Sequence, residues 1–321
     1  MRLGKLSNEQ LQRLILDKFE ANRPEVVLHP DVGVDCTAVD LGGELCVLST
    51  DPITGAANNI GALAVHICCN DAAACGAVPV GILTTLLLPP EADEALVDRI
   101  ASEVADAARL AGVDVLGGHT EVTDAVTRPV ISATVVAKAA RESLISSARM
   151  EPGDDLVMTK WAGLEGTSII AADCEERARE VLTPEEWGRA CALKDCLSVT
   201  RDAAIAMEHG AKAMHDITEG GVLGAAWEMA EASRCGLRLS LERVPLLDVT
   251  RKLCGHFGLN PYRLIASGAM LIACQDGPAM ARALRAGGIE AAVIGRAVET
   301  GVFCERGEVL PPEADELLKL F

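Results

Sequence analysis

The chain has 321 residues, half of them apolar and only 2% aromatic, and its formal net charge is −18. The length suggests two domains of ~150 residues each, with enough apolar residues for a core that needs no disulfides or metals. The acidic balance argues against nucleic acid as a partner, because nucleic-acid-binding proteins carry basic surfaces. No apolar run approaches the ~20 residues of a membrane span, and the first residues lack a signal-peptide pattern. We therefore expect no membrane partner and a cytoplasmic location.

Hydrophobic periodicity and turn residues divide the first half of the chain into alternating helices and strands. The expected order is a helix through 11–21, strands at 33–40 and 45–50, a largely buried helix at 60–77, a strand at 80–88, an amphipathic helix at 91–111, and strands at 113–118 and 130–138. Short connections between these elements fit helices layered on a sheet.

A domain boundary is expected at MEPGDDL (150–156), where a Pro-Gly turn with two acids leads into a new strand. We therefore divide the chain into domains at 1–150 and 151–321. The second domain is expected to contain a strand at 156–161, helices near 184–192, 198–208 and 219–234, strands near 237–241 and 269–274, a helix at 278–286, and strands up to 304.

Two sequence features favour structural explanations. The twelve cysteines include no CxxC pair, and most lie in apolar surroundings, where cysteine acts as a small hydrophobic residue. The heptapeptide LPPEADE occurs at 88–94 and again at 310–316. Because prolines followed by acids favour a helix start, we interpret the two copies as two similar helix starts rather than as a duplication.

The candidate functional residues are acids beside small residues, and neither a Walker-type loop nor a GxGxxG motif is present. Magnesium prefers oxygen ligands, commonly one or two carboxylates together with phosphates, and paired glycines let backbone N–H groups approach phosphate oxygens. The segments are GVDCTA (33–38), STDPIT (49–54), CCNDAAACGAVP (68–79), LGGHTEVT (116–123) and MHDITEGG (214–221). Their combination predicts a site for a metal–nucleotide complex.

Each of these residues also has a structural explanation. Asp51 precedes a proline and is a turn former, and His119 beside glycines is a turn residue. Asp216 and Glu219 are candidate caps for the helix at 219–234. Asp71 is harder to explain in this way, because an acid inside an apolar helix is costly unless it is paired or bound to metal.

The ordered set of motifs resembles the superfamily that contains aminoimidazole ribonucleotide (AIR) synthetase, thiamine-monophosphate kinase, selenophosphate synthetase and the hydrogenase-maturation protein HypE. The resemblance covers nearly the whole chain and is most specific in NDAAACGAVP and MHDITEGG. It also includes GDDLVMTKWAGLEGT (153–167) and IASGAML (265–271). HypE-like or AIR synthase-related proteins are the nearest match.

The resemblance implies an α+β fold with two domains. The N-terminal α/β domain would dimerise through a β-barrel, and the C-terminal α+β domain would form the substrate cleft. Nucleotide contacts would come from Asn70, Asp71, Gly117, Gly118, His119, Thr120, Lys138, Gly220 and Gly221. Magnesium ligands would be Asp35, Asp51, Asp71, Glu121 and Asp216. Val34 and His119 stand where many members have an acid, and Lys138 is equally explained as a solvated strand end.

The implied function is that of an ATP- and Mg²⁺-dependent enzyme, of kinase or synthetase type, that activates an acceptor by phosphoryl transfer. The acceptor would be a small molecule or a protein thiocarboxamide, and a maturation protein is a further expected partner. HypE-type maturation uses a C-terminal cysteine, whereas the given sequence ends in LLKLF. The alternative is a nucleotide-binding regulatory protein without turnover. An anionic acceptor group would meet Arg201, Lys212, Asn260 and Arg263, unless these are ordinary surface residues.

Overall fold

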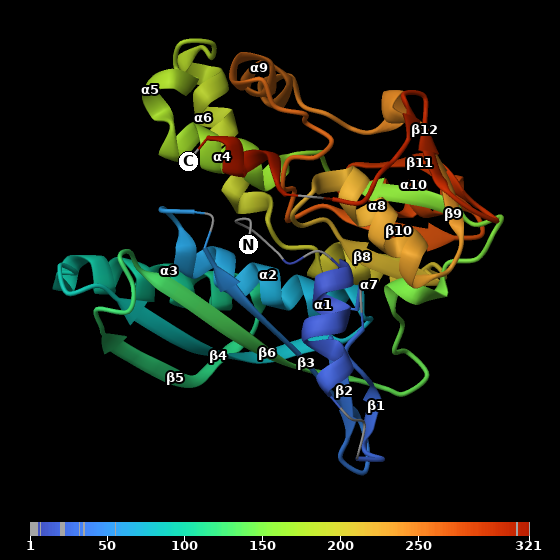
Figure 1. Ribbon diagram of the computed structural model, residues 1–321, viewed down its shortest axis with the longest axis horizontal. Helices are drawn as coiled ribbons and strands as arrows, with labels where there is room; N and C mark the ends of the chain where they lie inside the picture. The colour runs from blue at the N-terminus through green and yellow to red at the C-terminus, as the bar shows by residue number, and fades with distance from the viewer. Residues whose placement is uncertain are drawn as a thin grey trace.

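The structure is a computed structural model that describes residues 6, 8–19, 23–31, 33–34, 36–54, 56–312 and 314–320. These residues form two separate β-sheets, one from each half of the chain, with helices packed on both (Figure 1). In the described part of the chain, no helix is long and apolar enough to cross a membrane.

The first sheet has six strands among the described residues, in the order β1-β2-β3-β6-β4-β5. All neighbours pair antiparallel except β4 and β5, which run parallel. The strands are β1 (Val26–Leu28), β2 (Thr37–Asp40), β3 (Leu45–Ile53), β4 (Val78–Leu88), β5 (Asp114–Val122) and β6 (Val130–Ala139).

Two helices, α2 (Ile60–Ala74) and α3 (Glu94–Ala111), cover one face of this sheet, and its other face is left open (Figure 1). Helix α2 is buried along almost its whole length, which explains its continuous apolar sequence. Helix α3 buries a single stripe; Asp93 caps its start and Gly112, in the left-handed conformation, ends it. The short helix α1 (Asn8–Leu14) precedes β1.

The second sheet has seven strands among the described residues, in the order β13-β12-β9-β11-β7-β10-β8. Its strands are β7 (Asp155–Thr159), β8 (Ala213–Asp216), β9 (Gly236–Leu239), β10 (Met270–Cys274), β11 (Ala291–Val298), β12 (Val302–Cys304) and β13 (Gly307–Glu308). The helices of this half are α4 (Leu164–Asp173), α5 (Glu175–Ala178), α6 (Pro184–Ala192), α7 (Thr200–Glu208), α8 (Gly221–Ala232), α9 (Asp248–Phe257) and α10 (Gly277–Ala286).

Alternate residues of β7 enter two different cores, as the two-residue period of a strand requires. Leu156 and Met158 pack with α8, including Met229, on one face of the sheet. Val157 packs on the other face with α7 and α10 and also reaches Ala73 and Ala74 of α2. Helix α2 therefore contributes both to the core of its own half and to the core under the second sheet.

The amide of Asn70, which is fully buried in α2, also joins the two halves. Its nitrogen donates to the carbonyl of Leu197 and its oxygen accepts from the backbone N–H of Val199, each at 2.8 Å.

The mixed α+β class with two sheets agrees with the fold expected from the sequence. Most expected elements recur with small shifts at their ends, but the helix expected through 11–21 ends at Leu14, and β1, β13, α4, α5 and α9 were not anticipated. One expectation needs correction. Gly117 and Gly118 were expected at a turn, but β5 continues through them to Val122. Gly118 is needed there because of its close approach to β4, since a Cβ at this position would lie only 1.9 Å from the carbonyl oxygen of Thr84.

Candidate functional site

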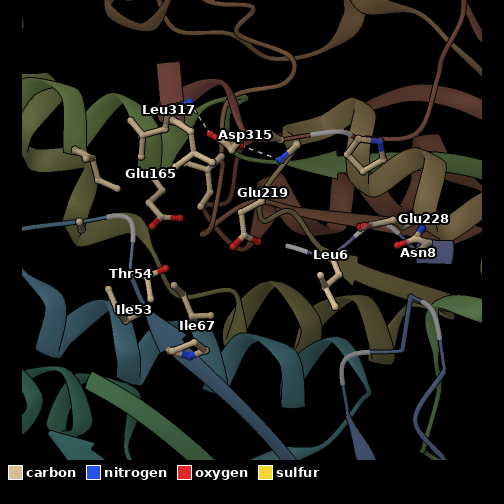
Figure 2. Close-up of a pocket in the computed structure, with 18 residues that line it drawn as sticks. Leu6, Asn8, Ile53, Thr54, Ile67, Glu165, Glu219, Glu228, Asp315 and Leu317 are labelled. Carbon is tan, nitrogen blue, oxygen red and sulfur yellow. Dashed lines mark hydrogen bonds between the residues drawn. The ribbon is translucent and has the colours of Figure 1, made fainter. Parts of the chain in front are cut away.

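A cavity of about 140 Å³ lies between the two halves of the chain (Figure 2). The first half contributes the end of β3 and the residues after it, together with Leu6, Asn8 and Ile67. The second half contributes α4, the segment before α8, Ile265 and the C-terminal segment from Pro312 to Leu318. The walls are apolar for the most part, which is typical of small-molecule sites.

The polar groups of the cavity are mostly carboxylates. Glu165, Glu219, Glu228 and Asp315 all line it, and none of its described lining residues is a lysine, arginine or histidine. Burial is the main cause that raises the pKa of Glu165 to about 8, with a smaller contribution from the charges of Glu219 and Asp315. Burial likewise raises the pKa of Asp315 to about 6.

Asp315 organises two segments around the cavity. Its carboxylate accepts hydrogen bonds from the backbone N–H groups of Gly220 and Leu317, both at 2.8 Å. The start of α8 is thus neutralised by a carboxylate of the chain itself, at a place where helices commonly bind anions. Gly220 and Gly221 were predicted to contact the nucleotide. In the structure, the Gly220 N–H donates to Asp315. Gly221 packs closely against the chain, since a Cβ there would lie 2.7 Å from the Leu264 carbonyl oxygen.

Two of the predicted magnesium ligands lie near each other on the covered face of the first sheet. Asp71, buried in α2, accepts a hydrogen bond from the Ser49 hydroxyl of β3 at 2.6 Å. Burial, and after it the charges of Asp71 and Asp51, raise the pKa of the Cys68 thiol, so both carboxylates lie close to that side chain. We call Asp51 and Asp71 the aspartate pair. Residues 52–54, directly after Asp51, line the cavity.

The GGHTE segment (117–121) lies on a different strand of the same sheet. Asp51 of β3 is in register with Ala133 of β6, Thr84 of β4 and Gly118 of β5. Three strand spacings separate Asp51 from Gly118, which corresponds to roughly 14 Å. The aspartate pair and the GGHTE segment of one chain are therefore too far apart to ligate one magnesium ion.

The polar residues of GGHTE are exposed on the edge strand. His119 Nε2 lies 3.0 Å from Glu121 Oε2, and both side chains are about half exposed, at 65% and 49%. Thr120 is exposed as well. His119 is a strand residue, so its explanation as a turn residue is wrong. Lys138, at the far end of β6, is 54% exposed and lies 3.7 Å from Glu44.

Asp216 is buried at the end of β8, beside His215, whose Nδ1 is 4.0 Å from its carboxylate. His215 Nε2 lies 3.3 Å from Glu228 Oε2, so this histidine links β8 to α8 and to the wall of the cavity. The alternative explanation of Asp216 and Glu219 as helix caps is wrong, because α8 begins after Gly220 and has no side-chain cap.

Of the predicted magnesium ligands, Asp35 lies outside the described residues. Among the residues that are described, no group of three or more histidine, cysteine or acidic side chains is arranged to hold a metal ion. The structure thus brings together Asp51 and Asp71, and it leaves Glu121 on a separate edge of the sheet. The expected ligand set stays a prediction.

The basic residues that were candidates for an anionic acceptor do not line the cavity. Lys212 instead forms ion pairs with Glu151 at 2.7 Å and with Asp154 at 2.8 Å. The Arg263 guanidinium donates to the carbonyl of Leu310 at 2.7 Å.

Sequence reasoning missed Glu165 and Asp315 as cavity residues. The available signal for Glu165 was an acid between the apolar stretches of LVMTKWAGLEGTSII (156–170), the same kind of signal that singled out Asp71. Asp315 is the sixth residue of the second LPPEADE copy, and Asp93 at the same place in the first copy caps α3. The interpretation of the repeat as two helix starts is therefore confirmed, and Asp315 adds a second acceptor role to its cap.

Comparisons with known proteins agree with this architecture. The AIR synthase related protein N-terminal domain matches residues 33–139, and the corresponding C-terminal domain matches residues 151–305. Carbamoyl dehydratase HypE of Rhodobacter capsulatus is 30% identical over 255 residues, which cover 77% of this chain and 72% of that protein.

Solved structures show the same fold. Hydrogenase maturation protein HypE in complex with ATP superposes with a TM-score of 0.70 at 22% identity, covering 98% of this chain and 97% of that one. AaThiL complexed with AMPPCP and TMP superposes with a TM-score of 0.76 at 21% identity, covering 98% and 99%.

The family-model matches confirm the resemblance on which the predicted function was based. The chain belongs to the AIR synthase related protein family, as a HypE-like member.

Proposed function

We propose that the protein binds ATP with magnesium. It transfers a phosphoryl group from ATP to activate an acceptor that is held between the two halves of the chain. The observation that carries this proposal is the position of the aspartate pair beside the cavity. Asp51 is followed directly by Pro52, Ile53 and Thr54, which line that cavity. A phosphate held through magnesium at the pair would thus border the space in which an acceptor fits.

The donor set at the pair fits magnesium. Two carboxylates, one from β3 and one from α2, match the usual protein contribution to a magnesium–phosphate site, and Ser49 holds the Asp71 carboxylate in place at 2.6 Å. Bound magnesium would supply charge neutralisation for the phosphates. The chain itself contributes positioning, because in phosphoryl transfer most of the catalysis comes from placement and electrostatics.

We also propose that the active form is a homodimer and that residues 1–150 and 151–321 are its two domains. The open face and the edge of the first sheet carry exposed apolar side chains, namely Val78, Val80, Leu83, Val115, Leu116 and Val122. Such a patch on a sheet favours association. Pairing of two open faces would form the expected barrel and would cover the exposed edge strand that carries the GGHTE segment.

The relatives suggest the chemical class of the acceptor but not its identity. Relatives named carbamoyl dehydratase act on a carbamoyl group, so a carbamoyl or thiocarboxamide group, small or protein-bound, is the first acceptor to test. A maturation protein that carries this group is the corresponding partner, and the cytoplasm is the proposed location.

The competing proposal is a nucleotide-binding regulatory protein without turnover. Val34 and His119, which replace acids found in many members, favour it because fewer carboxylates would hold the metal.

Phosphate release from ATP decides between the two proposals. It is measured with and without magnesium across a panel of carbamoyl and thiocarboxamide acceptors. The enzyme proposal predicts acceptor-stimulated release that Asp71→Asn abolishes and that Asp98→Asn, an exposed acid on α3, leaves unchanged. ATP binding without release on any acceptor supports the regulatory alternative. Release that Asp71→Asn leaves intact contradicts the assigned site.

A further inference from the structure

The carboxylates of the cavity differ in their hydrogen-bond partners. Asp315 accepts two backbone hydrogen bonds, and Glu228 lies 3.3 Å from Nε2 of His215. Glu165 is different. It is only 3% exposed, and its Oε2 has no hydrogen-bond partner among the described residues. A buried acceptor without a partner destabilises the folded protein, so a donor supplied by a ligand would stabilise it.

The position of Glu165 makes it available to a ligand. It lies in the first turn of α4, which is held against the segment before β10 because Gly166 N–H donates to the Ile265 carbonyl at 3.0 Å. Figure 2 shows its carboxylate pointing down into the cavity toward Thr54, with the carboxylate of Glu219 beside it. The Glu165 carboxylate therefore faces the space between the halves.

The electrostatics of the cavity favour a cationic ligand. Four carboxylates line it, its described lining residues include no lysine, arginine or histidine, and Glu228 has the His215 ring 3.3 Å away behind the wall. A cation placed among them is attracted by those that are ionised, and in a partly buried site this attraction is much stronger than in water.

A divalent metal ion is not the cation that best fits this cavity. In the described part of the chain, no three ligating side chains are grouped for a metal ion, in this cavity or elsewhere. The walls are largely aliphatic, with Ile53, Ile67, Ile169, Ile265, Leu317 and Leu318. Carboxylates set in aliphatic walls suit an organic cation, whose N–H groups donate to oxygen while its carbon chain contacts the walls.

We propose that this cavity binds an alkyl guanidinium or ammonium group, anchored on Glu165 with Glu219 and Asp315 as further acceptors. The group belongs either to a small-molecule acceptor or to an arginine or lysine side chain of a partner protein. The inference rests on the proposed function only in assigning the cation to the acceptor, because the binding itself needs no nucleotide.

Proton release is a signature of this binding. The pKa of Glu165 is raised to about 8, chiefly by burial and further by Glu219 and Asp315, while Ser267 lowers it. Glu165 is therefore mostly neutral at pH 7, and a cation favours its ionised form. The affinity rises with pH toward 8 and then levels off, with a slope that approaches tenfold per pH unit below the pKa.

The test is a calorimetric titration of the full chain with n-butylguanidinium and n-butylammonium, without nucleotide, from pH 6.5 to 8.5. n-Butylurea is the uncharged control of the same shape. We expect the guanidinium or the ammonium to bind at least tenfold more tightly than the urea at pH 8.5, with an affinity that rises with pH. Equal binding of urea and cations, no binding of either cation, or a flat pH profile would overturn the proposal.

Matched variants assign the anchor. Glu165→Gln, nearly isosteric, is expected to lose at least tenfold in affinity together with the pH dependence, and Glu185→Gln, an exposed acid on α6, changes neither. Unchanged binding by Glu165→Gln contradicts the assignment. If that variant does not fold, the pH profile and the urea comparison of the unmodified protein still decide the question.

The two sources are distinguished by comparing the affinity of a short peptide that has a central arginine with the affinity of free n-butylguanidinium. Tighter binding of the peptide assigns the cation to a partner protein, and tighter binding of the free cation assigns it to a small molecule. Because the titrations contain no ATP, a negative result here leaves the ATP-binding proposal untouched, and failure of ATP binding leaves this site untouched.

Discussion

The carboxylate of Asp315 accepts a hydrogen bond from the backbone N–H of Gly220, 2.8 Å away and 95 positions earlier in the chain. This contact fastens the C-terminal segment to the start of α8 and completes one wall of the cavity between the halves.

Replacement of Asp315 by alanine is predicted to destabilise the protein more than the same change at Asp93. Asp93 caps only α3 from an exposed position, so its loss should cost about 1 kcal/mol. Asp315→Ala leaves two buried N–H groups without their acceptor, at a cost of about 2–4 kcal/mol. Urea unfolding of both variants at pH 7 measures the difference, and equal losses would show that the Gly220 contact contributes nothing to stability.

Glu165→Gln is predicted to stabilise the free protein at high pH only. Because burial raises the pKa of Glu165 to about 8 from 4.5, the folded state binds a proton that the unfolded state has lost between these values. The contribution of Glu165 to stability is thus fully present below pH 4.5 and is lost as the pH rises to 8, by on the order of a few kcal/mol.

Thermal unfolding at pH 5 and pH 8 tests this sign. The variant should melt close to the unmodified protein at pH 5 and above it at pH 8. The change from Glu to Gln keeps the shape of the side chain, so a constant offset at both pH values would indicate a packing effect and would contradict the raised pKa.

The Asn70 amide is predicted to hold the two halves together. Asn70→Ala removes the partners of the Leu197 carbonyl and the Val199 N–H, at a cost of about 2–4 kcal/mol because both groups are buried. Hydrogen exchange should show faster opening of the segment before α7 in the variant. Unfolding free energy and exchange equal to those of the unmodified protein would contradict this role.

The open face of the first sheet is predicted to mediate dimer formation. Leu83→Asp places a charge at a side chain that is 42% exposed on β4, and burying this charge in an interface is costly. Light scattering should find a dimer for the unmodified protein and a monomer for this variant. Leu110→Asp is the control, since Leu110 is 82% exposed on α3. A monomeric unmodified protein, or loss of the dimer in the control as well, would contradict the proposed interface.

Much of the fold follows from local sequence signals. Helix α3 and strand β6 carry clear periodicities, and Asp93 and Gly112 mark the ends of α3 as capping residues should. The strand β1, with only three residues, and the helix α4, which is buried along most of its length, lack such periodicity. Their structure depends on tertiary contacts.

Site residues could be predicted only where their immediate neighbours in the sequence made them unusual. Asp71 stood out as an acid within an apolar helix, and the structure pairs it with Ser49. Register across a sheet cannot be deduced from one sequence, so the two strands that lie between Asp51 and Gly118, β6 and β4, were not foreseen. The cavity is formed by segments more than 100 residues apart, which explains why Glu165 and Asp315 were missed.

The central claim, a magnesium–nucleotide site at the aspartate pair, is tested most directly by thermal unfolding with ATP, ADP and GTP, each with and without magnesium. ATP at ~100 times its Kd should stabilise the protein by about 2.7 kcal/mol. The account predicts a rise in the unfolding midpoint with ATP and magnesium together, which Asp71→Asn removes and Asp98→Asn retains. No shift with any nucleotide, or an undiminished shift in Asp71→Asn, would contradict it.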